Sequence, residues 1–306
     1  MTQNNNLELI QKYGELKSCF KQYQNDGICI AYSGGVDSTL LIRAAIDAVC
    51  TDSKKASAKQ TACNEHDEAM NSSETQILTK PVLAIILETQ LHPHSDTEQA
   101  YERAREMGAT PVVISVDEFQ NPEILQNPVN RCYLCKHLLF SSLKELASAK
   151  GYHAIFDGTN KDDENEYRPG MKVLKELGIR SPLLDLGITK ACVRSISAML
   201  GLSTASVPST PCLATRLPYG AYLDRDLLQR IHQGEAFLRE KGFYNVRLRY
   251  HDPILRLEIN CDEFEKMLKL REEIIDELKK LGFVYITLDL EGFRSGSMDV
   301  HLTQQR

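Results

Sequence analysis

The feature of the sequence that most constrains its fold is a glycine-rich loop, Ser33-Gly34-Gly35-Val36-Asp37-Ser38, between two regular patterns. The apolar segment before it, residues 27–32, is typical of a buried parallel strand. The segment after it, residues 39–49, has apolar side chains at helical spacing. A strand, a tight turn and a helix in this order begin a βαβ unit, so the loop predicts an α/β fold with a parallel sheet.

The same alternation of strands and helices continues to about residue 206. Further strands are expected at 82–88, 112–116 and 153–156, and helices at 7–23, 95–107, 132–150 and 189–200. We therefore predict an open parallel sheet of the Rossmann-like type over residues 1–206. Residues 51–80 are polar and lack periodicity, and we expect an exposed, mobile insertion there.

The pattern changes at residue 207, which predicts a second, smaller domain over residues 207–306. Its first segment, residues 208–212, is rich in proline and is expected to be extended. A helix at 224–241, strands at 246–250 and 254–259, a helical apolar stripe at 264–281 and a strand at 285–290 follow. Helices and strands in this order indicate an α+β arrangement.

The glycine-rich loop is suited to binding phosphate. Glycines allow a sharp turn that brings backbone N–H groups close to an anion, and the helix N-terminus adds its positive dipole end. Ser33 and Ser38 add hydroxyl donors, and Asp37 is explained beside a phosphate if it holds Mg²⁺. An ordinary turn with helix-capping serines is the alternative. Neither a Walker A lysine motif nor Gly-x-Gly-x2-Gly after a strand is present, so a P-loop NTPase or a dinucleotide-binding site is not indicated.

Polar residues also follow the strand expected at 153–156. In an open α/β sheet, ligands bind beyond the carboxyl ends of the strands. We therefore expect Asp157 and Thr159 to contact a second Mg²⁺ or the ribose of a nucleotide. For Asp162 and Asp163, a solvated turn is nearly as good an explanation.

Three of the nine cysteines have surroundings that suggest chemistry. Cys132 and Cys135 form a C-x2-C pair at an expected helix start, and Cys212 lies in an irregular segment where a thiol can be exposed. Three thiolates without a fourth suit an iron–sulfur cluster with one open iron, whereas a zinc site needs a fourth ligand. The alternative is that the C-x2-C pair only packs one face of a helix.

Arginines form a second candidate group. Arg247 and Arg249 alternate along an expected strand and therefore share one face, and Arg216 follows Cys212 by four residues. Two arginines on one face suit bidentate binding of phosphate. A strand edge protected by charge explains the same spacing equally well.

Taken together, these segments resemble one family, the LarE-type sulfur transferases of the PP-loop ATP pyrophosphatase superfamily. The resemblance runs from about residue 5 to residue 300, and the block at 211–220 and the Gly-Phe-Arg-Ser-Gly-Ser sequence at 292–297 are its most specific parts. The matching segments, in order, are 33–38, 131–136, 157–160, 167–170, 180–184, 211–220 and 291–297.

The resemblance implies an ATP- and Mg²⁺-dependent enzyme of nickel-pincer nucleotide biosynthesis. A carboxylate of a pyridinium dicarboxylate mononucleotide would be adenylated with release of pyrophosphate, and sulfur would then replace AMP. In some members a cysteine is consumed as the sulfur source, leaving dehydroalanine. In others three cysteines hold a 4Fe-4S cluster, and the cysteines at 132, 135 and 212 make this chain similar to the second kind.

The same resemblance assigns the site residues. Cys212 and Asp37 would be catalytic, with Asp37 on Mg²⁺ and the three cysteines on the cluster. The substrate would be lined by Arg216, Glu235, Arg247 and Arg249. The nucleotide would be bound by Ala31, Ser33, Gly34, Gly35, Asp37, Ser38, Asp157 and Thr159.

Charge and hydropathy limit the partners. A PP-loop tRNA thiolase with a cysteine-bound iron–sulfur cluster is the second hypothesis. The net charge of −6 and the pI near 5.8 argue against it, because such an enzyme must bind a polyanion. The longest strongly apolar run, residues 82–87, is far shorter than a membrane-spanning helix, and no signal peptide is recognisable. We expect a cytoplasmic enzyme that binds a small nucleotide and forms homo-oligomers, as members of the family do.

Overall fold

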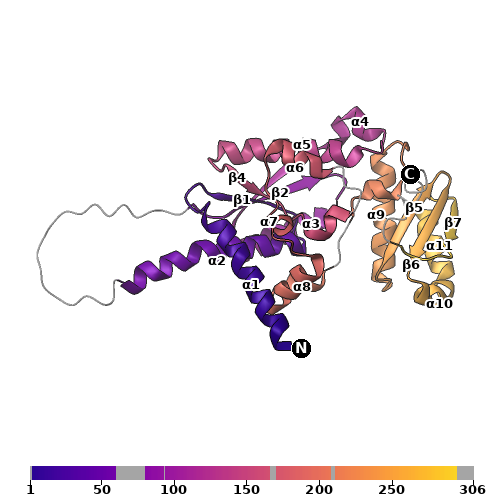
Figure 1. Ribbon diagram of the computed structural model, residues 1–306. Helices are drawn as coiled ribbons and strands as arrows, with labels where there is room; N and C mark the ends of the chain where they lie inside the picture. Colours follow the sequence, from indigo (N-terminus) through magenta and orange to yellow (C-terminus); the bar gives the residue numbers. More distant parts are fainter. Residues whose placement is uncertain (1, 60–79, 93, 166–169, 208–210, 295–306) are drawn as a thin grey trace, which may run out of the picture. The chain divides into compact units, whose positions relative to one another are not determined.

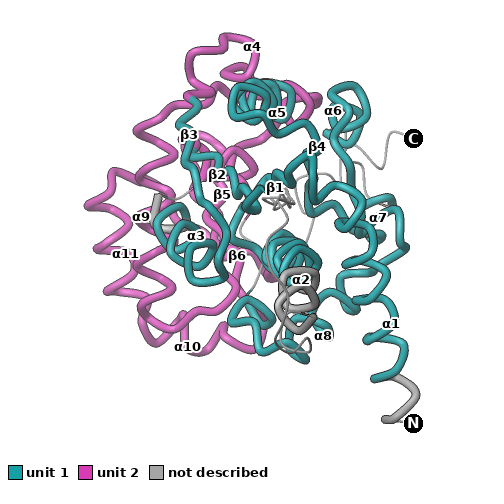
Figure 2. The backbone as a smooth tube through the Cα atoms, turned by 90° about the vertical axis from the view of Figure 1, so that its left-hand side faces the viewer, with its two compact units in different colours: residues 1–88, 94–116, 135–209 teal, residues 89–93, 117–134, 210–306 magenta. Residues whose placement is uncertain are grey.

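The computed structural model describes residues 2–59, 80–92, 94–165, 170–207 and 211–294. The chain forms two compact units, coloured separately in Figure 2. Unit 1 comprises residues 1–88, 94–116 and 135–209, and unit 2 comprises residues 89–93, 117–134 and 210–306. The division of the chain at residue 207 stays a prediction.

Unit 1 is built on a four-stranded parallel sheet with the strand order β3-β2-β1-β4. Its strands are β1 (Ile28–Tyr32), β2 (Leu83–Thr89), β3 (Thr110–Val116) and β4 (Ala154–Phe156). β1 lies in the middle, where it pairs in parallel with β2 and β4 and is buried along almost its whole length. The predicted α/β fold with a Rossmann-like parallel sheet is confirmed.

Helices cover both faces of this sheet, as Figure 1 shows. One face carries α1 (Thr2–Lys21), α2 (Val36–Lys59), α3 (His94–Glu106) and α8 (Lys190–Met199), and the other carries α5 (Arg131–Ala149) and α6 (Gly170–Leu177). On the first face, Leu16, Leu40 and Ile196 are fully buried against the strand residues Ile30 and Phe156. This core fixes the end of β1 and the start of α2, the two elements that flank the glycine-rich loop.

The helix α2 differs from its predicted extent at both ends. It begins at Val36, inside the glycine-rich loop, and continues to Lys59 rather than ending near Val49. Residues 51–59 are rich in alanine and lysine, which favour helix even without an apolar stripe. The rest of the predicted mobile insertion, residues 60–79, lies outside the described residues.

Unit 2 contains a three-stranded sheet with the order β5-β6-β7. β5 (Val246–His251) and β6 (Ile254–Ile259) pair in antiparallel fashion, and β7 (Tyr285–Leu288) joins β6 in parallel. The helix α9 (Arg225–Glu240) packs so closely on this sheet that a Cβ atom at Gly234 would lie 2.6 Å from Leu248 Cδ1. This contact explains the glycine inside a helix and places α9 directly beside β5.

The remaining helices of unit 2 are shorter than predicted. The apolar stripe at 264–281 forms two helices, α10 (Phe264–Lys269) and α11 (Arg271–Lys280), which meet at Leu270. Two further short helices, α4 (Pro122–Leu125) in unit 2 and α7 (Pro182–Asp185) in unit 1, escaped prediction because each has only four residues. Within the described part of the chain, no helix has both the length and the apolar character that crossing a bilayer demands.

Candidate active site

Hydrogen bonds of Ser33 and Ser38 stabilise the turn of the glycine-rich loop in unit 1. Gly34 has φ +74°, a left-handed conformation that side chains rarely adopt, and a Cβ atom there would meet the Ala100 side chain at 3.0 Å. Ser33 Oγ accepts the Gly35 N–H at 3.4 Å, and Ser38 Oγ accepts the Ser33 N–H at 3.3 Å. The first backbone N–H groups of any α-helix have no acceptor within the helix, so the N-terminus of α2 is suited to binding an anion.

Asp37 stands in the first turn of α2 with both carboxylate oxygens engaged. Oδ1 accepts a hydrogen bond from Asn160 Nδ2 at 3.4 Å, and Oδ2 forms an ion pair with Lys190 Nζ. A single carboxylate next to phosphate oxygens is a common arrangement for Mg²⁺. The Asp37 carboxylate is therefore a suitable ligand for Mg²⁺ if the ion replaces the ammonium group of Lys190 at Oδ2.

The turn after β4 lies against this loop. A Cβ atom at Gly158 would be 3.1 Å from Asp37 Cβ and 3.1 Å from the Ser38 amide nitrogen. A side chain at this position would be tighter than ordinary packing allows, so Gly158 lets the turn after β4 lie close to the start of α2.

Asp157 is buried and already satisfied by protein groups. Ser181 Oγ donates to Oδ1 at 2.5 Å, Thr159 Oγ1 donates to Oδ2 at 2.6 Å, and Lys136 Nζ lies 3.5 Å from Oδ2. These contacts hold Asp157 and Thr159 in a hydrogen-bonded network. Their direct contact with a nucleotide or Mg²⁺ stays a prediction.

Cys212 in unit 2 directly precedes a 3-10 helix, Leu213–Arg216, and is half-buried. The segment is anchored by the Leu213 N–H, which donates to the Leu91 carbonyl at 2.9 Å. Burial raises the pKa of the Cys212 thiol, and the positive charge of Arg131 acts in the opposite direction. The thiol of Cys132 is near enough to raise the pKa of Cys212 further.

Arg131 connects the two cysteine segments. Its guanidinium is buried, and it donates to Asn127 Oδ1, to the Ala214 carbonyl at 3.4 Å and to Cys132 Sγ at 3.7 Å. No pattern in the sequence predicts that Arg131 reaches the segment that follows Cys212.

The iron–sulfur prediction rests on three thiols. Cys132 is exposed and Cys135 half-buried in the first turn of α5. Thiolates are suitable ligands for such a cluster, yet no group of three or more Cys, His, Asp or Glu side chains in the described ranges is arranged to hold a metal ion. Cys135 belongs to unit 1 and the other two cysteines to unit 2, and the cluster stays a prediction.

Arg216 and Glu235 form a buried ion pair in unit 2, with exposed side-chain fractions of 1% and 0%. Arg216 Nε and Nη2 donate to the two carboxylate oxygens at 2.6 and 2.9 Å. Burial alone would raise the pKa of Glu235, but the hydrogen bonds and charge of Arg216 outweigh it and lower that pKa. Removing one partner of such a pair typically costs about 3–5 kcal/mol because the other charge is left buried and unpaired, so a substitution of either residue alone is expected to destabilise this region.

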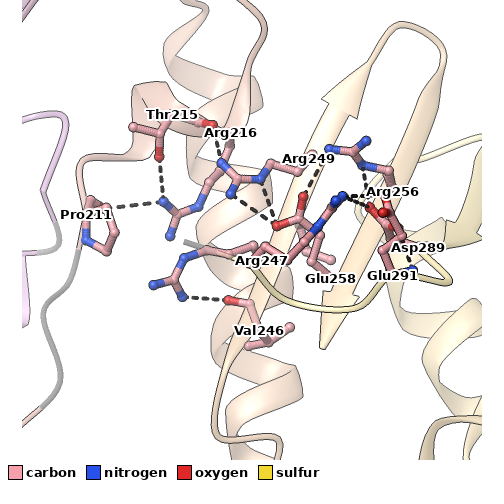
Figure 3. Close-up of polar contacts among 12 residues, drawn as sticks. Pro211, Thr215, Arg216, Val246, Arg247, Arg249, Arg256, Glu258, Asp289 and Glu291 are labelled. Carbon is pink, nitrogen blue, oxygen red and sulfur yellow. Dashed lines mark hydrogen bonds and ion pairs between the residues drawn. The ribbon is translucent and has the colours of Figure 1, made fainter. Parts of the chain in front are cut away.

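The two arginines of β5 have different surroundings, which Figure 3 shows. Arg249 is buried and donates from Nε to Glu258 Oε2 at 3.1 Å and from Nη1 to the Thr215 carbonyl at 2.6 Å. Arg247 donates to the Val246 carbonyl at 2.7 Å and lies over the Phe293 ring, without a carboxylate partner among the described residues. Burial and the nearby charge of Arg216 lower the pKa of Arg247 to about 10. A half-buried cation without a carboxylate is the strongest anion-binding candidate of the three arginines.

Comparison with known proteins decides the family. No family model matches the chain. It is 35% identical, over 97% of both chains, to an uncharacterized protein of Synechocystis. It is 31% identical, over 97% of its own length and 96% of the relative's, to the pyridinium-3,5-bisthiocarboxylic acid mononucleotide synthase of Lactiplantibacillus plantarum. The chain belongs to the LarE family of sulfur transferases.

Membership of the LarE family confirms the resemblance drawn from the sequence, and it makes the protein an enzyme of sulfur transfer. A further relative, an uncharacterized protein of Methanocaldococcus jannaschii, is 29% identical over 94% of this chain and 100% of its own. The tRNA thiolase hypothesis is not favoured, because the relative whose name states an activity is a mononucleotide synthase.

In this LarE-family chain, several residues at the two sites were not recognised from the sequence. Asn160 and Lys190 contact Asp37 from positions 123 and 153 residues away, and Ser181 contacts Asp157. No local pattern marks such partners. The only available signal was their place directly after a strand or at a helix start, where side chains of a parallel sheet gather.

Proposed function

We propose that the protein is an ATP-dependent sulfur transferase that converts a carboxylate of a pyridinium dicarboxylate mononucleotide into a thiocarboxylate, in the biosynthesis of a nickel-pincer nucleotide. The observation that supports this most is the 31% identity, over nearly the full length of both chains, to a synthase named for such a product. The glycine-rich loop at the end of β1 gives independent support for a nucleotide with a phosphate tail.

The first step is adenylation. A carboxylate oxygen of the substrate attacks the α-phosphorus of ATP, an O–P bond forms, and the bond to the β-phosphate bridging oxygen breaks, releasing pyrophosphate. The loop amides and the hydroxyls of Ser33 and Ser38 bind the departing pyrophosphate. Asp37 would hold Mg²⁺, which would supply positive charge to neutralise the phosphate oxygens.

The second step is sulfur transfer. The thiolate of Cys212 attacks the acyl carbon, a C–S bond forms, and the C–O bond to AMP breaks. Adenylation is needed because AMP is a far better leaving group than a carboxylate oxygen. Burial raises the pKa of the Cys212 thiol and the charge of Arg131 offsets this only in part, so the thiol must lose its proton before it attacks; the thiolate is then a strong nucleophile.

The sulfur must then leave the protein with the product. The Cβ–S bond of Cys212 breaks, its electron pair stays on sulfur as the thiocarboxylate, and the Cα proton is lost, leaving dehydroalanine at position 212. No step of this sequence passes through a cluster.

The substrate is anchored through its phosphate by Arg247. Arg216 and Arg249 are already paired with Glu235 and Glu258, whereas Arg247 has no carboxylate partner among the described residues. We propose that Arg247 supplies the direct contact with the phosphate.

A direct assay tests the proposal. Purified protein is incubated with ATP, Mg²⁺ and pyridinium-3,5-dicarboxylic acid mononucleotide, and pyrophosphate release and thiocarboxylate formation are followed by a coupled assay and mass spectrometry. We expect both products to depend on the substrate and on ATP. Release of pyrophosphate with tRNA instead of the mononucleotide would contradict the proposal and favour a thiolase.

We also propose an alternative use of the same cysteines, in which the thiols of residues 132, 135 and 212 bind a 4Fe-4S cluster when iron and sulfide are present; Cys212 would then be a ligand that is not consumed, and sulfur would come from outside the polypeptide. Protein purified without oxygen is then expected to be brown and to contain iron, and the Cys132→Ala variant is expected to be nearly colourless because one of three ligands is missing. The Cys261→Ser variant, which changes an exposed cysteine of unit 2, is the control. Equal iron content in the parent and Cys132→Ala proteins would contradict the cluster.

A further inference from the structure

We propose that Phe293 is a positioning residue for phosphate binding: its ring holds the guanidinium group of Arg247 and leaves the remaining N–H donors of that group free for an anion. The inference rests on the proposed contact between Arg247 and the substrate phosphate. It gives a role to the phenylalanine of the Gly-Phe-Arg-Ser-Gly-Ser sequence at 292–297, one of the most specific parts of the resemblance to the family. Three features of unit 2 support it: the turn that places Phe293, its contact with Arg247, and the pairing of the neighbouring carboxylates with other arginines.

The position of Phe293 is fixed by the turn that follows β7. The Phe293 N–H donates to the Ile259 carbonyl at 2.7 Å, and the Gly292 N–H donates to the Asp289 carbonyl at 3.1 Å. Gly292 has φ +70°, and a Cβ atom there would lie 2.9 Å from the Ile259 carbonyl oxygen and 2.6 Å from Cys261 Sγ. A side chain at position 292 would therefore push the turn away from the end of β6.

This turn brings the Phe293 ring to Arg247. Ile259, the acceptor of the Phe293 N–H, is the register partner of Val246 in the pair of β5 and β6. Arg247 directly follows Val246, and its Cζ lies 5.2 Å from the centroid of the Phe293 ring. A cation this close to the face of an aromatic ring is attracted by the electrons of that face. Both side chains are half-buried, so water screens the attraction only in part.

An aromatic ring holds an arginine differently from a carboxylate. The Arg249 guanidinium donates to Glu258 Oε2 at 3.1 Å, so its charge is neutralised and its donors are occupied. The Phe293 ring attracts Arg247 without neutralising its charge. To the described residues Arg247 makes one hydrogen bond, from Nη1 to the Val246 carbonyl at 2.7 Å, which Figure 3 shows. Arg247 therefore keeps its positive charge and several N–H donors for a phosphate.

The carboxylates around Arg247 are engaged by other arginines. Glu258 faces Arg247 in the register of the two strands, but its oxygens bind other guanidinium groups, among them Arg256 Nη2 at 3.0 Å. Glu291, in the turn itself, lies 2.7 Å from Arg294 Nη2. Among the described residues, the Phe293 ring is therefore the side chain that keeps the Arg247 guanidinium in place, and its loss would let this flexible cation change its rotamer.

Binding of the pyridinium dicarboxylate mononucleotide without ATP, measured by calorimetry, tests the inference. We expect Phe293→Leu to weaken binding by about 3- to 30-fold, the range for loss of a cation–π contact between partly buried groups, and Phe293→Tyr to retain the parent affinity. The control is Tyr285→Leu, which changes an exposed aromatic residue of β7 at the end of the sheet that pairs with Ile254. Thermal unfolding of each variant confirms that it is folded.

Two comparisons separate positioning of Arg247 from a general effect on the fold. Phe293→Leu should bind the dephosphorylated nucleoside as tightly as the parent does, because that ligand has no phosphate for Arg247. In an Arg247→Met background, Phe293→Leu should cause no further loss of affinity for the mononucleotide. Equal weakening toward both ligands, or the same loss with and without Arg247, would overturn the inference.

A third measurement keeps the shape of the ring, and it also serves if Phe293→Leu does not fold. Incorporation of 3,4,5-trifluorophenylalanine at position 293 withdraws electrons from the ring face with little change in volume, so we expect weaker binding of the mononucleotide. Parent-like affinity of this protein, or of Phe293→Leu, would overturn the role of Phe293 alone. Failure of the parent to bind the mononucleotide, or parent-like affinity of Arg247→Met, would contradict the proposed function as well.

Discussion

Replacing Asp37 by alanine should lower substrate-dependent pyrophosphate release by at least about 100-fold, because the carboxylate proposed to hold Mg²⁺ is lost. The ion would otherwise neutralise charge that develops on the leaving pyrophosphate, and the protein has no second carboxylate within the loop to replace it. The side chain lies at the surface end of α2 and is 18% exposed, so its removal should leave the core of unit 1 intact. The measurement is the initial rate of pyrophosphate release at saturating ATP and substrate.

A matched control is the Asp26→Ala variant, which removes an exposed carboxylate of the same unit before β1. It should retain the parent rate. Raising the Mg²⁺ concentration should rescue Asp37→Ala only in part, because the ion would then be held by the nucleotide alone. A parent-like rate of pyrophosphate release in Asp37→Ala would show that Asp37 does not bind the ion.

The sequence was most informative where function depends on contiguous residues. The glycine-rich loop, the strand before it and the helix after it could be predicted together, because glycine conformation and apolar periodicity are local properties. The ends of α2 were less certain, since Lys59 lies in a polar segment where propensity alone continues the helix. The partners of Asp37 could not be predicted from the sequence, because tertiary packing brings Asn160 and Lys190 to it.

The arginines illustrate a different limit. From spacing alone, Arg247 and Arg249 were equivalent residues on one face of a strand. In the sheet, Glu258 is in register with Arg247 yet forms its ion pair with Arg249, the diagonal neighbour. Side-chain direction therefore decides which arginine lacks a carboxylate partner in the described part of the chain, and a single sequence does not contain that information.

Replacing Cys212 by serine should separate the two half-reactions. Adenylation precedes attack by sulfur, so the variant should still release pyrophosphate in a first turnover. Thiocarboxylate formation should fall by at least about 1,000-fold, since a serine hydroxyl is largely protonated near neutral pH and is a much weaker nucleophile than a thiolate. Rapid quenching followed by mass spectrometry of the acyl adenylate and the thiocarboxylate measures both steps in one experiment.

The Cys261→Ser variant is the control for this comparison, because Cys261 is an exposed cysteine of the same unit and should be dispensable. Loss of pyrophosphate release along with thiocarboxylate in Cys212→Ser would contradict the proposed order of steps. The intact mass of the parent protein after one turnover then identifies the sulfur source. A loss equal to one H₂S, localised to Cys212, is expected if the elimination step proceeds as proposed. An unchanged mass with full product formation would contradict that step and would instead require sulfur supplied from outside the polypeptide.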